Sequence, residues 1–359
     1  EINETNVLIS NNSAIQINDV YGGNNLGGTT DNATSNITVN GGTIGNIYGG
    51  GNKVGLDESN VTVTGGSITS VYGGSNNSGD LNESNVVIGS TTNTITIVDV
   101  YGGNNIGGVT DEANITVTNS NITNLYGGGN QATVGSTHVD VDTATIQNIY
   151  GGGNQAGVTG NTYLDIDNAT IPTNVYGGGN QGTVGGNTEV YITSSTIGGS
   201  AYAGGNGSSA IVTGNTTITV DGNTTVGSSS STGTQGSVFG GGNAAATGND
   251  TNNNSVATVN IVGGHIYGNV YGGANTSVVY GETHTNIGTR VVNNNSLTEA
   301  DLIIEGTVFG GGEANASGAD TYDFSFISVT QGIDVNIDGY NYLNNNHRFE
   351  LNGSIFGSG

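Results

Sequence analysis

The sequence predicts an all-β fold, a parallel β-helix (β-solenoid) of about 12 coils with about 24–26 residues in each regular coil. The first observation is a repeated phrase, complete as Tyr-Gly-Gly-Gly-Asn at residues 48–52. The second is a set of short segments in which Val, Ile and Thr alternate apolar and polar with a period of two, which is typical of strands with one buried face. The third is that no stretch has the 3.6-residue period of a crossover helix.

The aromatic phrase divides the chain into repeats. Its intervals are 24–29 residues up to position 202 and reach 47 residues further on. We therefore expect a single solenoid domain over residues 1–359, with regular coils in 1–226 and coils with loop insertions in 227–359, the largest at about 314–346. The twelve aromatic residues are Tyr21, Tyr48, Tyr72, Tyr101, Tyr126, Tyr150, Tyr176, Tyr202, Phe239, Tyr271, Phe309 and Phe356.

One unit, residues 60–76, shows the expected order of elements. Residues 60–64 alternate as a strand, the pair Gly65-Gly66 turns the chain, residues 67–72 form a second strand, and residues 73–76 turn it again. Stacked coils place equivalent residues about 4.8 Å apart, so Val61, Val63, Ile68 and Val71 should each begin an inward column. Glycine runs suit corners where φ is positive or where backbones crowd.

Composition excludes several classes of partner. The chain has 28 acidic and only 3 basic residues, and its net charge is −25. Nucleic acid binding needs several cations to neutralise phosphates, and anionic membrane surfaces are disfavoured for the same reason. No apolar run has the length of a membrane span. Without Cys, and without Met at position 1, we expect a piece of a longer precursor. Three basic residues leave trypsin-like proteases few sites, which suits an extracellular protein, on the cell surface or secreted.

The aromatic column is the first candidate binding site. If Ile47 points inward, simple alternation turns Tyr48 outward, and the stacked coils then present a flat aromatic track for glycan rings or a neighbouring fibre. Two alternatives stay open: offset-stacked rings that stabilise the solenoid and cover the glycine backbone, or rings turned inward as core. The candidate residues are Tyr48, Tyr72, Tyr101, Tyr126, Tyr150, Tyr176, Tyr202, Phe239 and Tyr271.

Stacked carboxylates are the second candidate. Asp140 and Asp142 precede Asp165 and Asp167 by one coil, since 165 − 140 and 167 − 142 both equal 25. Carboxylates about 5 Å apart repel each other, and Ca²⁺ relieves such repulsion through hard oxygen ligands. Calcium-binding nonapeptide repeats, however, place Asp within the Gly-rich turn, where this chain has Asn and Gln. A solvated acidic face is the competing interpretation, and no other cofactor is expected.

The largest insertion is the third candidate, because insertions in repeat folds gather on the functional face. Unlike the rest of the chain, it is rich in aromatic residues, and Tyr322, Phe324, Tyr340 and Tyr342 are its candidate binding residues.

Catalysis is not expected. The four His are scattered without metal-ligand spacing, and there is no Cys nucleophile, phosphate-binding loop ending in Lys, or nucleophile elbow. Carboxylate pairs occur, as they must in any acidic chain, so a glycan-cleaving β-helix stays open as a hypothesis.

The repeated aromatic-Gly-Gly-Gly-Asn followed by strands such as Asn-Val-Thr-Val-Thr at residues 60–64 resembles Gly/Asn/Thr-rich β-helical repeats of prokaryotic adhesin-like surface proteins. These include the pectin-lyase-like solenoids of autotransporter passengers. The resemblance implies extracellular display, adhesion or a stalk role. The chain departs from the solenoid enzymes: Gly264-His265-Ile266 lacks their Gly-His-Gly, and Lys53, Arg290 and Arg348 match no lyase motif.

These observations lead to one main hypothesis, a non-enzymatic structural or adhesive rod of a prokaryotic cell surface. A self-assembling fibre subunit that stacks end to end through uncapped coils is the first alternative. A glycan-binding or glycan-cleaving β-helix is the second. The expected partners are the chain itself, end to end or laterally, or host and cell-surface glycans and proteins.

Overall fold

A computed structural model describes residues 3–27, 33–90, 95–251, 253–288, 300–313, 329–339 and 347–358. In these residues the fold is all-β, with parallel sheets stacked as a β-solenoid of about 11 turns, which confirms the predicted fold class. Twelve aromatic positions delimit eleven turns. The chain divides into two compact units, residues 1–164 with 179–183, and residues 165–178 with 184–359. That residues 1–359 form a single domain, with regular coils in 1–226 and coils with loop insertions in 227–359, stays a prediction.

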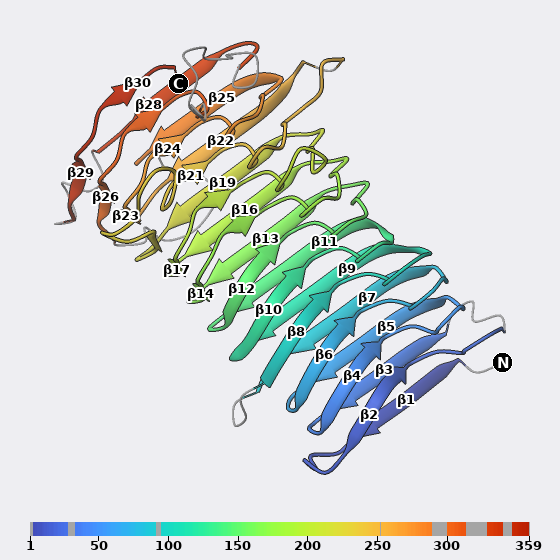
Figure 1. The fold of residues 1–359 in the computed structure, drawn as a ribbon. Coiled ribbons are helices and arrows are strands. Elements are labelled where there is room, and N and C mark those ends of the chain that lie inside the picture. The colour runs from blue at the N-terminus through green and yellow to red at the C-terminus, as the bar shows by residue number, and fades with distance from the viewer. Residues whose placement is uncertain are drawn as a thin grey trace. The chain divides into compact units, whose positions relative to one another are not determined.

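Two parallel sheets build the first unit, and successive coils contribute one strand to each (Figure 1). The first sheet, which we call sheet A, has the order β1 (Glu4–Ile9), β3 (Thr34–Val39), β5 (Leu56–Val63), β7 (Leu81–Ile88), β9 (Val109–Thr118) and β11 (Thr133–Asp142). Sheet B has the order β2 (Gln16–Tyr21), β4 (Thr43–Tyr48), β6 (Ser67–Tyr72), β8 (Ile95–Tyr101), β10 (Ser120–Tyr126) and β12 (Thr145–Tyr150). The strand β13 (Thr162–Asp167) spans the division between the units.

The second unit repeats this plan. Its sheet A strands are β16 (Thr188–Thr193), β19 (Thr216–Asp221), β22 (Ser255–Ile261), β25 (Gly281–Ile287) and β28 (Ile333–Ile337). Each coil contributes two short strands to sheet B, and these are β14 (Thr170–Ile171), β15 (Val175–Tyr176), β17 (Thr196–Ile197), β18 (Ala201–Tyr202), β20 (Thr225–Val226), β21 (Val238–Phe239), β23 (Gly264–Ile266), β24 (Val270–Tyr271), β26 (Leu302–Ile304), β27 (Val308–Phe309), β29 (Phe349–Leu351) and β30 (Ile355–Phe356).

The inward columns follow the register that the sequence predicted. Val61 pairs with Ile37 on one side and Val86 on the other, and all three side chains are buried. In sheet B, Ile68 continues the column of Ile44 in the same way. β-Branched residues suit these columns because their restricted χ1 lets them pack along a pleated surface.

A glycine at the corner after the aromatic residue is required by close packing between coils. A Cβ built on Gly49 would lie 2.2 Å from the carbonyl oxygen of Gly73, and one on Gly73 would lie equally close to that of Gly102. Neither φ angle is in the positive region. Crowding, rather than left-handed backbone, therefore explains this glycine.

A buried hydroxyl closes each of several coils. Ser59, in the middle of β5, donates to the carbonyl of Gly73 at the corner after sheet B, and Thr137 of β11 donates to Gly151 in the same way. Thr188 and Thr216 form equivalent bonds in the second unit, to Ala203 and Gly240. The alternation of apolar and polar residues does not by itself predict these inward, coil-closing hydroxyls.

Candidate functional site

The aromatic residues of the first unit form one continuous stack. The ring centroids of Tyr48 and Tyr72 lie 5.0 Å apart with planes inclined by 8°, and those of Tyr72 and Tyr101 lie 4.8 Å apart. Tyr21, Tyr126 and Tyr150 extend the stack at 4.8–5.1 Å. Offset stacking at this spacing stabilises each ring pair by about 0.5–1.5 kcal/mol beyond area burial.

The second unit carries a stack of its own. Tyr202 and Phe239 have ring centroids 4.7 Å apart, and Tyr271 lies 4.7 Å from Phe239 on the next coil. Tyr176 precedes them at 5.1 Å, and Phe309 follows at 4.9 Å. Phe239, which has no hydroxyl, is fully buried within this stack.

The predicted outward orientation of these rings is wrong. The nine candidate side chains are only 0–8% exposed, so they present no flat track to solvent. Ile47 and Tyr48 are both buried at the end of β4, because the chain bends into the glycine corner there and strict alternation stops. The stacked-ring alternative describes what the structure contains. Glycan binding by Tyr48, Tyr72, Tyr101, Tyr126, Tyr150, Tyr176, Tyr202, Phe239 and Tyr271 stays a prediction that no observation supports.

Burial changes the ionisation of the stacked phenols. It raises the pKa of Tyr126 to about 12, and the neighbouring phenol of Tyr150 adds to the effect. Burial also raises the pKa of Tyr202 to about 12, although hydrogen bonds from Asn275 and Ser200 oppose the shift. Both phenols are therefore neutral at physiological pH, and the stacks carry no charge at these positions.

A ladder of asparagine side chains continues the motif beyond the aromatic ring. The amide nitrogen of Asn130 donates to the Oδ1 of Asn105 at 2.9 Å, and that of Asn154 donates to Asn130 at 2.9 Å. Asn275 and Asn243 repeat the bond in the second unit at 2.9 Å. The next position is Glu313, whose Oε2 is buried and has no hydrogen-bond partner among the described residues. The motif's last residue thus binds coil to coil.

The Asp candidates fall in different units. Asp140 and Asp142 belong to the first unit, where Asp140 is 50% exposed and lies 3.1 Å from the Nε2 of His138. Asp165 and Asp167 belong to the second. Throughout the described ranges, no group of three or more His, Cys, Asp or Glu residues is arranged to hold a metal ion. Calcium at these Asp residues stays a prediction.

The insertion aromatics Tyr322, Phe324, Tyr340 and Tyr342 lie outside the described residues. Sequence reasoning also missed the outward-facing tyrosines. Tyr163 occupies a part-exposed position of β13 and packs against the ring of His138, with centroids 4.5 Å apart. Tyr191 donates a 2.5 Å hydrogen bond to Glu189. The period of two within each strand already places both residues on the outer face.

A charged network covers the last coils of the second unit. The Nε of Arg348 lies 2.8 Å from Asp301, and the Arg348 amide and guanidinium together hold the pKa of that carboxyl below its usual value. The Nε2 of His265 lies 2.8 Å from Glu305. Hydrogen bonds from the Asn352 amide and from His265 lower the pKa of Glu305. Carboxylates held ionised in this way are poor general acids, so this network does not suggest glycoside hydrolysis.

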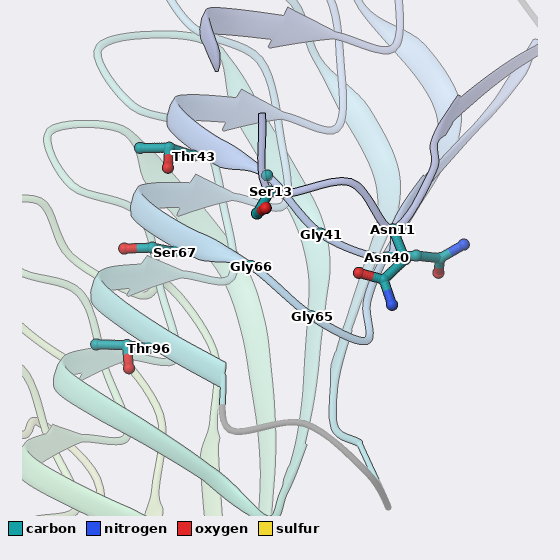
Figure 2. A pocket seen from close by; sticks show the side chains of 10 residues that line it. Asn11, Ser13, Asn40, Gly41, Thr43, Gly65, Gly66, Ser67 and Thr96 are labelled. Atoms are coloured by element: carbon teal, nitrogen blue, oxygen red, sulfur yellow. The ribbon is translucent and has the colours of Figure 1, made fainter. Parts of the chain in front are cut away.

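A groove of about 430 Å³ lies in the first unit, beside the turns that lead from sheet A to sheet B (Figure 2). The side chains of Thr43, Ser67 and Thr96 form one wall, and Asn11 and Asn40 lie opposite. The side chains that line the groove end in hydroxyl or amide groups, and none of them is ionisable.

Comparisons with protein-family models, curated proteins and solved structures gave no match to this chain. The described residues contain no helix long and apolar enough to cross a membrane.

Proposed function

We propose that this chain is a non-enzymatic structural and adhesive β-solenoid displayed outside a prokaryotic cell. The observation that carries the proposal is the stack of buried aromatic rings with the asparagine ladder beside it, as at Tyr126 and Asn130. These repeated side chains are engaged in holding one coil to the next. Side chains used in this way maintain the shape of the protein rather than convert a substrate.

Composition supports an extracellular location. Only three Lys or Arg residues interrupt the chain, so proteases that cleave after basic residues have few sites. The net charge of −25 keeps such a protein soluble and discourages contact with anionic surfaces. The adhesin-like family suggested by the aromatic-Gly-Gly-Gly-Asn motif is part of the same proposal, because such proteins combine long Gly/Asn/Thr-rich solenoids with display at the cell surface.

Single-molecule force spectroscopy of the full chain tests the structural role. A scaffold should unfold in steps at high force, and Tyr101→Ala, which removes one ring from the stack, should lower the force of some steps. Thr116→Ala, a change at an exposed side chain of β9, is the matched control. Unfolding at low force, with no difference between the two variants, would contradict a mechanical role for the stack. Turnover of any glycan by the purified chain would contradict the non-enzymatic part.

A second candidate function is self-assembly, favoured by the last described coil. Ile355 and Phe356 of β30 are each 50% exposed, although Phe356 stacks on Phe309 with centroids 5.4 Å apart. An exposed strand with apolar side chains invites pairing with another chain. Electron microscopy of the purified chain should then show unbranched filaments that Phe356→Lys abolishes. Isolated particles at micromolar concentration would count against this candidate.

A further inference from the structure

The groove beside Thr43, Ser67 and Thr96 is lined by a column of hydroxyl groups. Thr43 pairs with Ser67, and Ser67 with Thr96, at successive positions of sheet B. The three hydroxyls therefore stand in one column, about 4.8 Å apart. Figure 2 shows them pointing to the same side of the sheet, with the glycine turns beside them.

The three hydroxyls have no hydrogen-bond partner among the residues that the structure describes. Elsewhere in the first unit, asparagine side chains such as Asn60 and Asn130 donate to an asparagine of the preceding coil. By contrast, the hydroxyls of Thr43, Ser67 and Thr96 form no hydrogen bond within the described part of the chain. Asn40 accepts a 2.7 Å bond from Thr64 through its Oδ1, which leaves its two amide hydrogens available.

The glycine turns keep the groove open. At the turns from sheet A to sheet B, the pairs Gly41-Gly42 and Gly65-Gly66 include φ angles of 94° at Gly42 and 108° at Gly66. The later coils of the first unit make the same connection with one left-handed residue that carries a side chain, as at Asn119 (φ 45°) and Thr143 (φ 54°), and the double glycine returns only in the second unit, at Gly263-Gly264 (φ 102° at Gly264). The double-glycine turns carry no side chain that could fill the groove, so its hydroxyl and amide groups lie beside uncovered backbone.

The chemistry of the lining selects the ligand. Hydroxyls, amide groups and backbone recognise hydroxyl and acetamido groups, and the lining offers no charge to pair with an ion. A volume of about 430 Å³ lies in the range of small-molecule sites. We propose that this groove binds an uncharged oligosaccharide that lies along the stack of coils, with Thr43, Ser67 and Thr96 each facing one sugar residue. The inference deepens the adhesive part of the proposed function and rests on it.

Titration calorimetry of the full chain with two neutral probes, cellotetraose and tetra-N-acetylchitotetraose, tests this inference. We expect at least one of them to bind, and the triple variant Thr43→Val, Ser67→Ala, Thr96→Val to bind at least tenfold more weakly. Valine keeps the shape and strand preference of threonine and removes only the hydroxyl. Thr116→Val is the matched control, because Thr116 is an exposed strand residue of sheet A that does not line the groove.

Three results would overturn the inference. They are no binding of either probe at millimolar concentration, equal binding by the triple variant, and tighter binding of the anionic tetragalacturonate. If the triple variant does not fold, the methyl signals of Thr43 and Thr96 in the wild-type chain give the answer, because only a ligand in the groove shifts them. Unfolding force distinguishes the two proposals. If only the groove proposal is wrong, the wild-type chain still unfolds at high force. If the structural role is wrong, the wild-type chain unfolds at low force.

Discussion

The hydroxyl of Thr137 donates a 2.7 Å hydrogen bond to the carbonyl oxygen of Gly151, fourteen residues later and across the interior of one coil. The bond ties the middle of β11 in sheet A to the corner after the buried aromatic residue Tyr150. The same bond recurs in both units, from Ser35 to Gly49, Ser59 to Gly73, Ser84 to Gly102, Thr188 to Ala203, Thr216 to Gly240 and Thr283 to Gly310. Each coil that is closed in this way buries a hydroxyl and a carbonyl group that are hydrogen-bonded to each other.

Replacing Thr137 by Val should destabilise the first unit by about 1–3 kcal/mol, because the Gly151 carbonyl loses its donor and is left buried. Valine preserves side-chain volume, so the loss reports the hydrogen bond. Urea unfolding followed by circular dichroism measures the change. Thr137→Ser should recover most of the stability, and the exposed Thr116→Val should have little effect. Equal stability of the Thr137 and Thr116 variants would show that the bond is unimportant.

Removing one ring from the aromatic stack should cost more. Tyr126→Ala empties a buried site between Tyr101 and Tyr150, and the expected loss is about 3–5 kcal/mol. Tyr126→Phe should cost less than about 1 kcal/mol, because it keeps both ring contacts. Thermal unfolding of the two variants compares them directly. A large loss for Phe would mean that the hydroxyl, rather than stacking, stabilises this position.

Much of the fold follows from the sequence because a solenoid repeats one local pattern. The period of two fixes the inward columns at Val61 and Ile68, and the aromatic phrase fixes the coil length. What alternation does not give is the corner: Ile47 and Tyr48 are both buried, since the chain bends where Gly49 packs beneath the next coil. Period counting works along a strand and fails where the strand ends.

The candidate sites were predicted less well for a related reason. The residue type of a serine such as Ser67 does not show whether its hydroxyl closes a coil, joins a ladder or faces an open groove. Only the arrangement of neighbouring coils separates these roles, and the groove depends on two glycine turns that follow each other on adjacent coils. Alternation along β13 predicts that Tyr163 faces outward, whereas the repeated aromatic phrase marks rings that are buried.

Alkaline pH should destabilise the protein. In the folded chain burial raises the pKa of Tyr126 and of Tyr202 to about 12, while an unfolded tyrosine has a pKa of about 10. The unfolded state therefore loses its protons first, and the stability that these phenols contribute is complete below about pH 10 and lost as pH rises through about 12. Urea midpoints across this window, together with tyrosinate absorbance, measure the effect. The double variant Tyr126→Phe, Tyr202→Phe should flatten the dependence, and an unchanged slope would refute this assignment.

An aspartate in place of one asparagine should disrupt the asparagine ladder of the first unit. Asn130→Asp keeps the acceptor for Asn154 but replaces the donor to Asn105 by a carboxylate oxygen, which repels the Oδ1 of Asn105. We expect a loss of about 1–3 kcal/mol at neutral pH, part of which returns near pH 4 when the carboxylate is protonated. Asn121→Asp adds the same charge at an exposed position of β10 and is the control. Unfolding of both variants at the two pH values checks the prediction, which fails if they behave alike.

The second unit offers the reverse substitution. Glu313 follows Asn275 in the ladder, and its Oε2 is buried without a partner among the described residues. Glu313→Asn should let an amide donate to the Oδ1 of Asn275, as Asn275 donates to Asn243, and should stabilise this unit by about 1 kcal/mol. The pKa of Tyr271, which burial raises first and Glu313 raises further, should fall at the same time. Urea unfolding and tyrosinate titration give the two readings. Glu313→Gln, which is longer than Asn, tests whether ladder geometry or loss of charge is responsible: equal stabilisation by both would assign the gain to charge, and a decrease with Asn would contradict the ladder.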